Sequence, residues 1–446
     1  MPDKIKKEKS RLWKRLYRDF SLGPARIERF ISQMHAEMDA GLAGRKSSLE
    51  MLPAFVDIPS GKEKGRFIAL DLGGTNFRLL ELRLKGNGRI KKLKEKKFIL
   101  KDSYIKGNGE ELFDFFAGCI KDFSGSASCD IGFTFSFPVR QKAVASGILL
   151  YWTKGFSATG VVGKDVVAML NEALAQKGLT GIKVSALVND TVGTLVSRAY
   201  QDHSCDTSVI LGTGTNACYR EKFSRIAKWK GAGTKSGYML VNTEWGNFNK
   251  VDVTVYDRML DNASENPGYH LLEKMISGMY LGELVRLVML DTAKQGILFC
   301  GKMPAVLRSR RSFKTENMSC IAADQTASLV KTEALLRKLG VIGSSYADRR
   351  QIKEICNLIA SRSALLSAAA LAAIILKVDP RVLRKHTVAV DGTVYEKYPG
   401  FAKKIRVGLG QILGNKAKKI KIALTKDGSG TGAAIIAAIS KEEGYA

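Results

Sequence analysis

The chain has 446 residues, 45% of them hydrophobic, so it is too long for one compact core and apolar enough to pack two lobes. Seven dispersed cysteines without a CxxC pair and four scattered histidines exclude a disulfide framework, a cysteine zinc site and a histidine-rich metal site. This cysteine usage favours a reducing compartment, and we expect a cytoplasmic protein. The formal net charge of +28 favours a solvated basic surface or one that attracts polyanions.

The first 62 residues or so are predicted to be mainly helical and to end in a linker rich in proline and glycine. Leu12, Leu16 and Phe20 recur every four residues, as on one face of a basic amphipathic helix. No apolar stretch follows the N-terminal charges, as a secretory signal would require. The alanine-rich stretch 364–376 is too short to span a bilayer, so we expect a buried core helix there and no transmembrane segment.

The stretch FIALDLGGTNFRLLELRL, residues 67–84, contains two apolar runs joined by a glycine turn. The alternation within 77–84 predicts a strand, and so does the apolar run before the glycines. Asp71 stands where the first strand ends, and a turn of Gly73, Gly74, Thr75 and Asn76 follows. A plain hairpin needs turn glycines but no carboxylate at this place, so Asp71 indicates a functional turn.

The rest of the chain alternates strand and helix patterns, which predicts an α/β fold. Strands are expected at 129–137, 182–190, 207–219 and 237–248, and a helix at 166–178. Helical patterns dominate from about 269 to 378 and run through 269–290. A late strand is expected at 386–398, then a helix, a strand at 419–427 and a closing alanine-rich helix.

A second glycine turn, VILGTGTNACY, repeats the setting of the first, with an apolar strand followed by Gly212, Thr213 and Gly214. Two such turns predict two related lobes that face one cleft and hold a polyphosphate with backbone N–H groups from both sides. No GxxxxGK[ST] motif is present, which disfavours a P-loop fold. The C-terminal GSGTG has too few residues after Gly432 for a dinucleotide fold. Its glycines are expected to let the chain turn tightly into a helix whose N-terminus faces the cleft.

Four further segments place polar groups beside glycine or aromatic residues: FTFSFPV (133–139), WTKGF (152–156), VNDTVGTL (188–195) and NTEWGNF (242–248). A polyhydroxy substrate needs such carboxylates, amides and hydroxyl or lysine donors. Clusters of basic residues occur at 91–97, 308–311 and 403–421, without a nucleic-acid-binding motif. Charge alone predicts at most weak, salt-sensitive binding to nucleic acid or acidic membranes.

Together these motifs resemble those of the eukaryotic hexokinases, members of the actin-like sugar kinase superfamily, from about residue 15 to 442. DLGGTNFR and LGTGTN resemble the two phosphate motifs, and NDTVGTL and GSGTGAA the two motifs that connect the lobes. DGTVYEKYPGF resembles the adenosine motif, and WTKGF and NTEWGNF the sugar-binding segments.

The resemblance implies a two-lobed actin-like ATPase (ribonuclease H-like) fold around a sugar and ATP cleft. Residues 1–63 would be a helical part of the large lobe, and 64–190 the small lobe with the first phosphate turn. Residues 191–430 would form the rest of the large lobe, and 431–446 a C-terminal helix returning to the small lobe.

The resemblance also implies roles for individual residues. Asp190 matches the base that deprotonates the sugar 6-hydroxyl. Asp71 would face Mg-ATP through metal-bound water, and Arg78 would supply positive charge near the transferred group. Sugar contacts are expected from Ser136, Thr153, Lys154, Asn189, Asp190, Asn216, Glu244 and Glu273, with Lys154 also catalytic. ATP contacts are expected from Asp71, Gly73, Gly74, Thr75, Asn76, Gly212, Thr213, Gly214, Gly392 and Thr393.

The implied activity is transfer of the γ-phosphate of Mg-ATP to the 6-hydroxyl of glucose and related hexoses, the step that opens glycolysis. An actin- or chaperone-like ATPase would share the phosphate turns but would not need WTKGF and NTEWGNF together. A catalytically idle, basic binding protein would be indicated by loss of Asp190 or Glu244, and both are present.

Overall fold

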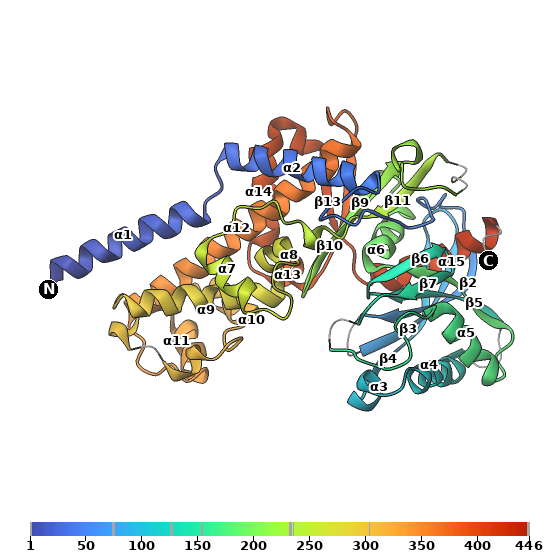
Figure 1. Ribbon diagram of the computed structural model, residues 1–446, viewed down its shortest axis with the longest axis horizontal. Helices are drawn as coiled ribbons and strands as arrows, with labels where there is room; N and C mark the ends of the chain where they lie inside the picture. The colour runs from blue at the N-terminus through green and yellow to red at the C-terminus, as the bar shows by residue number, and fades with distance from the viewer. Residues whose placement is uncertain are drawn as a thin grey trace.

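Two β-sheets form the centres of two lobes in the computed structural model, which describes residues 2–73, 76–124, 128–152, 155–231, 234, 236–302 and 304–443. Figure 1 shows the helix-rich lobe on the left, with α1 extending beyond it, and the smaller lobe on the right. The described part of the chain has the mixed α/β organisation that the sequence predicts.

The small-lobe sheet has the strand order β4, β3, β2, β5 and β8, with bounds Ile90–Ile99, Asn76–Lys85, Lys64–Leu72, Cys129–Phe135 and Ile182–Val188. Every residue of β5 is buried, because helices cover both faces of the sheet at this strand. Strands β2 and β3 pair antiparallel and place Asp71 opposite Arg78. The register therefore brings the two charged residues together at the end of the sheet where the first glycine turn begins.

The large-lobe sheet has the order β1, β11, β10, β9, β12 and β13, with bounds Leu52–Pro53, Tyr238–Asn242, Thr215–Lys222, Cys205–Leu211, His386–Asp391 and Ile420–Leu424. Strands β9 and β12 are parallel neighbours, with Asp391 opposite Ile210. Both strands consequently end at the same edge, where Gly212 and Gly392 follow them. The remaining short pair is β6 and β7, at Val139–Ala143 and Ser146–Leu149.

Two helices lie between the sheets. Helix α6, Asp190–Ala199, packs on β9 and β10, and helix α15, Gly428–Glu443, packs on β2, β5 and β8. They also pack on each other, and their buried apolar residues form one cluster with residues from both sheets. In Figure 1 the red α15 and the green α6 join the two lobes.

The glycines of GSGTG serve this helix contact, which corrects the expectation that they form a tight turn before a helix. Helix α15 already begins at Gly428. A methyl group at Gly432 would lie 1.9 Å from the carbonyl oxygen of Gly193 in α6, and one at Gly132 would lie 2.0 Å from that of Ala433. Glycine is required because any side chain would push the backbones apart.

The helices α3, α4 and α5 cover the outer part of the small lobe, at Asp102–Lys106, Gly109–Ser124 and Val166–Gln176. The large lobe carries α1 and α2 (Pro2–Phe20 and Pro24–Leu42), α7–α9 (Val255–Asn262, Leu271–Ile276 and Gly278–Lys294), α10–α12 (Thr315–Ala323, Val330–Lys338 and Tyr346–Val378) and α13–α14 (Thr393–Lys397 and Phe401–Leu413). Short 3₁₀ turns η1–η5 occupy Phe223–Arg225, Trp245–Asn247, Phe299–Gly301, Ala305–Arg308 and Gly414–Lys419.

Helix α12 contains the alanine-rich stretch. By length and composition it is the one helix of the described chain that could cross a membrane. However, 83% of its apolar 18-residue stretch is buried inside the protein. Leu366, Ile374 and Ile375 lie in the main hydrophobic cluster of the large lobe. The prediction of a buried core helix is confirmed.

Two further expectations are corrected. The late strand ends at Asp391, and the residues after Gly392 form α13, because the positive φ of 117° at Gly392 turns the chain away from the sheet. The helical stretch 269–290 is broken at Ser277, whose ψ of 154° is extended. At this break Gly278 donates its N–H to the carbonyl of Gly212, 2.8 Å away, so the interruption seats α9 on the second glycine turn.

The α6–α15 contact gives a stability prediction. Replacing Gly432 by alanine should lower the free energy of unfolding by about 1–3 kcal/mol, because the new methyl group overlaps the Gly193 carbonyl. Gly410→Ala is the matched control, since Gly410 lies in α14 with nothing within 4 Å of the new methyl group. It should be neutral or stabilising by about 0.5–1 kcal/mol. Urea denaturation measures both, and equal effects would show that the close helix contact is unimportant.

Candidate active site

The second glycine turn connects β9 to β10 and is held by backbone hydrogen bonds. Gly212 donates to Gly214 O at 3.0 Å, while its own carbonyl accepts from Gly278 and that of Thr213 accepts from Met279. The N–H groups of Thr213 and Gly214 donate to none of the described residues. They are therefore available to an anion, as the nest prediction requires.

Gly392 lets two strand ends meet at this turn. A methyl group at Gly392 would lie 2.4 Å from the Leu211 carbonyl, and one at Gly214 would lie 2.8 Å from Glu273 Oε2, whereas one at Gly212 would make an ordinary contact of 3.4 Å with Gly392 Cα. The ends of β9 and β12 thus approach more closely than a residue with a Cβ at position 392 would allow.

A cavity of about 490 Å³ opens beside the turn, between α9, α10 and α13. Its lining includes Thr213, Gly278, Thr393 and Tyr398, together with the basic residues Arg311, Lys314 and Lys397. The volume lies in the range typical of small-molecule sites. Thr393 therefore lines a cavity large enough for a small molecule, and its contact with adenosine stays a prediction.

The small lobe contributes a charged cluster at the end of β2. Arg78 donates from Nη2 to Asp71 Oδ2 at 2.9 Å, and Ser429, at the start of α15, donates its hydroxyl to the same oxygen at 3.0 Å. Arg78 also forms an ion pair with Asp427 and lies 3.7 Å from Glu95. Burial opposes the charge of Arg78, but the carboxylates of Asp71 and Asp427 raise its pKa, so the guanidinium stays charged.

Amides and a carboxylate interlock at the large-lobe side of the site. Asn216 donates from Nδ2 to Glu244 Oε1 at 3.0 Å and to Asn242 Oδ1 at 2.8 Å. Asn242 donates from Nδ2 to the same Glu244 oxygen at 2.7 Å. Glu244 has a left-handed backbone with φ of 52°, which bends its carboxylate back toward Asn242. The three side chains form one preorganised polar cluster.

Glu273, on α8, links this cluster to the second glycine turn. Its Oε2 accepts the backbone N–H of Thr215 at 3.0 Å. The hydroxyl of Thr215 accepts from Trp245 Nε1 at 2.9 Å and donates to the Ile210 carbonyl. Thr215, the residue that follows the second glycine turn, thus fixes the position of Glu273 relative to that turn.

Asn189 and Asp190 stand at the N-terminus of α6. Asn189 is the helix cap, because its Oδ1 accepts from the N–H of Thr191 at 2.9 Å and from the Thr191 hydroxyl at 2.5 Å. Its Nδ2 donates to no other described residue. Asp190 is half-buried and accepts the N–H of Thr191 at 2.8 Å.

The charges of the two lobes act on each other. Burial raises the pKa of Glu244 to about 7, and the negative charges of Asp190 and Glu273 add to this, although hydrogen bonds from Asn242 and Asn216 oppose it. Burial also raises the pKa of Asp391, helped by Asp190, Asp427 and Asp71. Acids whose pKa values are raised by burial and by one another's charges are typical of active sites.

Most of the residues predicted for the site thus converge on the ends of β2, β9 and β12 and the starts of α6 and α15. Ser136 directly follows β5 and donates its N–H to Leu72 O at 3.3 Å, so it also lies at this edge of the small lobe. Gly73 ends the described part of the first turn, and Asn76 begins β3. Gly74, Thr75, Thr153 and Lys154 lie outside the described residues.

Sequence reasoning missed three residues at this site, Asn242, Asp391 and Asp427. Asp391 carries the signal that singled out Asp71, a carboxylate where a strand ends before glycine. Asn242 is marked only by its place two residues before Glu244. Asp427 has no local signal, since its partner Arg78 is 349 positions away.

Among the described residues, no three histidine, cysteine, aspartate or glutamate side chains come close enough together to chelate an ion. Mg²⁺ instead uses one or two carboxylates, water and substrate phosphates. After burial, repulsion from Asp190, Asp427 and Asp71 helps to raise the pKa of Asp391, and a divalent cation would relieve that repulsion.

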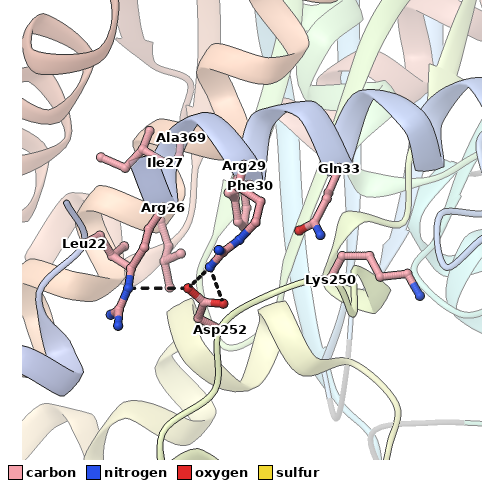
Figure 2. A pocket seen from close by; sticks show the side chains of 10 residues that line it. Leu22, Arg26, Ile27, Arg29, Phe30, Gln33, Lys250, Asp252 and Ala369 are labelled. Carbon is pink, nitrogen blue, oxygen red and sulfur yellow. Dashed lines mark hydrogen bonds and ion pairs between the residues drawn. The ribbon is translucent and has the colours of Figure 1, made fainter. Parts of the chain in front are cut away.

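A second pocket, between α2 and α12, is much too small for a sugar or nucleotide. Figure 2 shows it beside Asp252, where Arg29 donates to both carboxylate oxygens at 2.8 and 2.6 Å. Arg26 lies 3.6 Å from the same carboxylate. The pocket holds about 20 Å³, space for a water molecule.

Comparison with known proteins agrees with this geometry. Two family models, both described as hexokinase, match residues 12–200 and 206–439. Hexokinase-2 of Oryza sativa subsp. japonica is 43% identical over 436 residues, which cover 93% of this chain and 88% of that protein. The chain belongs to the hexokinase family.

Other relatives extend the comparison. Human hexokinase HKDC1 is 41% identical, and the match covers 92% of this chain but 46% of that protein. The structure of the hexokinase from Schistosoma mansoni complexed with glucose superimposes with a TM-score of 0.86 at 36% identity, covering 96% of this chain and 99% of that chain. The predicted family and two-lobed fold are confirmed, and membership of this family implies ATP as the co-substrate.

The raised pKa of Glu244 predicts a pH-dependent effect on stability. A carboxyl group whose pKa is higher in the folded than in the unfolded protein stabilises the fold at low pH and loses that contribution as pH rises. For Glu244 the loss falls between its ordinary pKa of 4.5 and about 7. Glu244→Gln should therefore gain stability relative to the natural protein at pH 8, by at most about 3 kcal/mol, and not at pH 4.5.

Thermal unfolding at both pH values measures this difference. Glu37→Gln is the control, because hydrogen bonds from Ser47 and Ser48 lower the pKa of Glu37 despite its partial burial. That variant should lose stability at pH 8. A Glu244→Gln variant that is equally destabilised at both pH values would show that Glu244 carries no buried charge.

Proposed function

We propose that this member of the hexokinase family transfers the γ-phosphate of ATP to the 6-hydroxyl of glucose and related hexoses. The observation that carries the proposal is the polar cluster of Asn216, Asn242 and Glu244, set beside Glu273 and within electrostatic range of Asp190. Paired amides and carboxylates suit the adjacent hydroxyls of a sugar ring. The similar hexokinase from S. mansoni forms a complex with glucose, which supports the same substrate here.

Asp190 is proposed as the general base. Its carboxylate starts helix α6, and Thr191 N–H holds one of its oxygens. The Asp190 carboxylate would accept the proton of the sugar 6-hydroxyl as the hydroxyl oxygen attacks phosphorus. Glu244 has its pKa raised to about 7, partly by the charge of Asp190, so the two acids respond to each other.

The other sugar contacts follow from the donors and acceptors on each side chain. Asn189 keeps Nδ2 for a hydroxyl oxygen because its Oδ1 caps α6. Glu244 would use Oε2 to accept from a hydroxyl, since Oε1 already accepts from both asparagines. Glu273, Ser136, Thr153 and Lys154 complete the proposed sugar set, with Lys154 also acting on the transferred group.

The phosphates would lie between the two glycine turns. Gly73, Gly74, Thr75 and Asn76 are proposed to cradle them from the small lobe, and Gly212, Thr213 and Gly214 from the large lobe. Arg78 would stabilise the charge on the transferred group, while Gly392 and Thr393 border the adenosine. Mg²⁺ would be held by Asp71 through water, and its chemistry is to neutralise phosphate charge. Seven free thiols support our proposal of a reducing, cytoplasmic location.

We further propose that sugar draws the lobes together. Ser136 belongs to the small lobe, whereas Asn216, Glu244 and Glu273 belong to the large lobe. A sugar that touches both sides binds a closed form more tightly than an open one, so it shifts the population toward closure. Closure excludes water and aligns Asp190 with the phosphate. ATP hydrolysis without sugar should then be slow.

The base assignment predicts that Asp190→Ala lowers kcat by about 10²–10⁴-fold. Glucose should still bind, because the amide and glutamate contacts remain. A coupled assay of glucose 6-phosphate formation measures kcat, and calorimetry measures glucose binding.

Glu244→Ala is the contrasting variant, since it removes a sugar contact and leaves the base in place. It should raise the KM for glucose more than it lowers kcat. Near-normal turnover by Asp190→Ala would contradict the base assignment, and absence of activity in the natural protein with glucose and Mg-ATP would contradict the proposed reaction.

A further inference from the structure

The strongest charged feature outside the active site lies at the N-terminal ends of β12 and β13. Seven exposed basic residues gather there, and we name them the polybasic edge: Arg381, Arg384, Lys385, Lys416, Lys418, Lys419 and Lys421. The two segments that carry them, 380–385 and 414–421, contain no acidic residue. In Figure 1 the orange and red segments around β13 lie at the upper margin of the large lobe, away from the small lobe.

The fold holds these segments side by side. Lys419 donates from Nζ to the carbonyls of Val382 and Leu383, at 3.0 and 2.9 Å. In the sheet, His386 pairs in register with Ile420, so the strands that leave the two segments are neighbours. The polybasic edge is therefore a built surface, not two independently placed loops.

Nearby carboxylates neutralise only part of the charge. Asp202 accepts from Lys421 at 3.1 Å, and Asp206 forms an ion pair with Arg384 at 2.7 Å. Asp379 caps the turn by accepting the N–H groups of Leu383 and Arg384. In contrast, Arg381, Lys385, Lys416 and Lys418 have no carboxylate partner among the described residues.

The chemistry of the polybasic edge favours nucleic acid over a lipid surface. A helix that lies on a bilayer inserts an apolar face, but Phe401, Ile405 and Leu409 of the adjoining α14 are buried where that helix packs on α12. Leu383 and Val407 are the large apolar residues exposed on segment 380–385 and α14, too few for an apolar face. Segments 380–385 and 414–421 also contain no aromatic residue on which an unpaired base could stack. Cations without stacking groups suit the phosphates of a duplex, whose contacts need only Lys and Arg.

We propose that the polybasic edge binds the phosphate backbone of double-stranded nucleic acid, in addition to the catalytic function of the protein. The site is distinct from the catalytic one because β12 runs from the polybasic edge at His386 to the active site at Asp391. At ~3.3 Å per residue, this separates the two by about 17 Å. A bound duplex would leave the active site open.

The test compares two variants that lose the same charge at different places. The first replaces Arg381, Lys385, Lys416 and Lys418 by glutamine. The control replaces Lys121, Lys142, Lys164 and Lys183, four exposed lysines without an ion pair in the described chain, which are spread over the small lobe. Fluorescence anisotropy measures binding to labelled 24-base-pair RNA and DNA duplexes between 50 and 200 mM salt, and phosphatidylserine vesicles are the comparison ligand.

We expect the natural protein to bind both duplexes with a steep salt dependence. Each phosphate contact contributes about 0.9 to the slope of log K against log salt, so the polybasic-edge variant should lose about 3 to 4 from the slope and at least tenfold in affinity at 100 mM salt. The control should stay within about threefold of the natural protein, as its charges are dispersed.

Equal losses in both variants would overturn the proposal, because binding would then follow net charge alone. Absence of duplex binding at 50 mM salt, or tighter binding to vesicles than to duplex, would overturn it too. The rate of glucose phosphorylation should be unchanged in both variants. This assay therefore also shows whether each variant is folded. The double variant K416Q and K418Q gives a second measurement if the fourfold one unfolds, and it should lower the slope by about 2.

Discussion

The contact between α6 and α15 fixes the geometry on which the whole site depends. The backbones meet at Gly193 and Gly432 without room for a side chain. Helix α6 is tied to the large-lobe sheet, since Ser208 donates to the Thr191 carbonyl at 2.6 Å. Helix α15 is tied to the small-lobe sheet, since Thr134 donates to the Ser429 carbonyl at 3.1 Å. This one crossing therefore sets how Asp190, at the start of α6, stands relative to Asp71, beside the start of α15.

The two sides of the site are organised in different ways. At the end of β2, charge neutralisation holds Asp71 and Arg78 of the small lobe together with Asp427, which lies between β13 and α15. On the large lobe, hydrogen bonds hold Asn216, Asn242 and Glu244 while burial works against the charge of Glu244. The unfavourable free energy of this partly exposed carboxylate, which its surroundings shield from water, has a reason, because a sugar hydroxyl would donate to the Glu244 oxygen that the asparagines leave unused. The charge of Glu244 lowers the stability of the sugar-free protein, and a hydrogen bond from a bound sugar would restore that stability.

Much of this arrangement could be predicted from the sequence. Strand patterns ending at Asp71 and Leu211, each followed by glycine and threonine, predict two turns at strand ends, and the family resemblance names Asn216, Glu244 and Glu273, which the structure brings together beside the second turn. Their roles toward phosphate and sugar stay predictions. Contacts between distant residues could not be predicted in this way. The role of Asn242 depends on the left-handed backbone of Glu244, and that of Asp427 on an ion pair across 349 positions. The glycines of α15 gave a misleading turn signal because their partner, Gly193, lies on another helix.

The central claim is that the sugar contacts are divided between the lobes and come together when glucose binds. Small-angle scattering with and without saturating glucose, in the absence of nucleotide, tests it most directly. The radius of gyration should fall with glucose in the natural protein and in Asp190→Ala, which keeps the other sugar contacts on both lobes. It should stay constant in Glu244→Ala at the same sugar concentration. An unchanged radius in the natural protein, under conditions where calorimetry shows glucose bound, would contradict the claim.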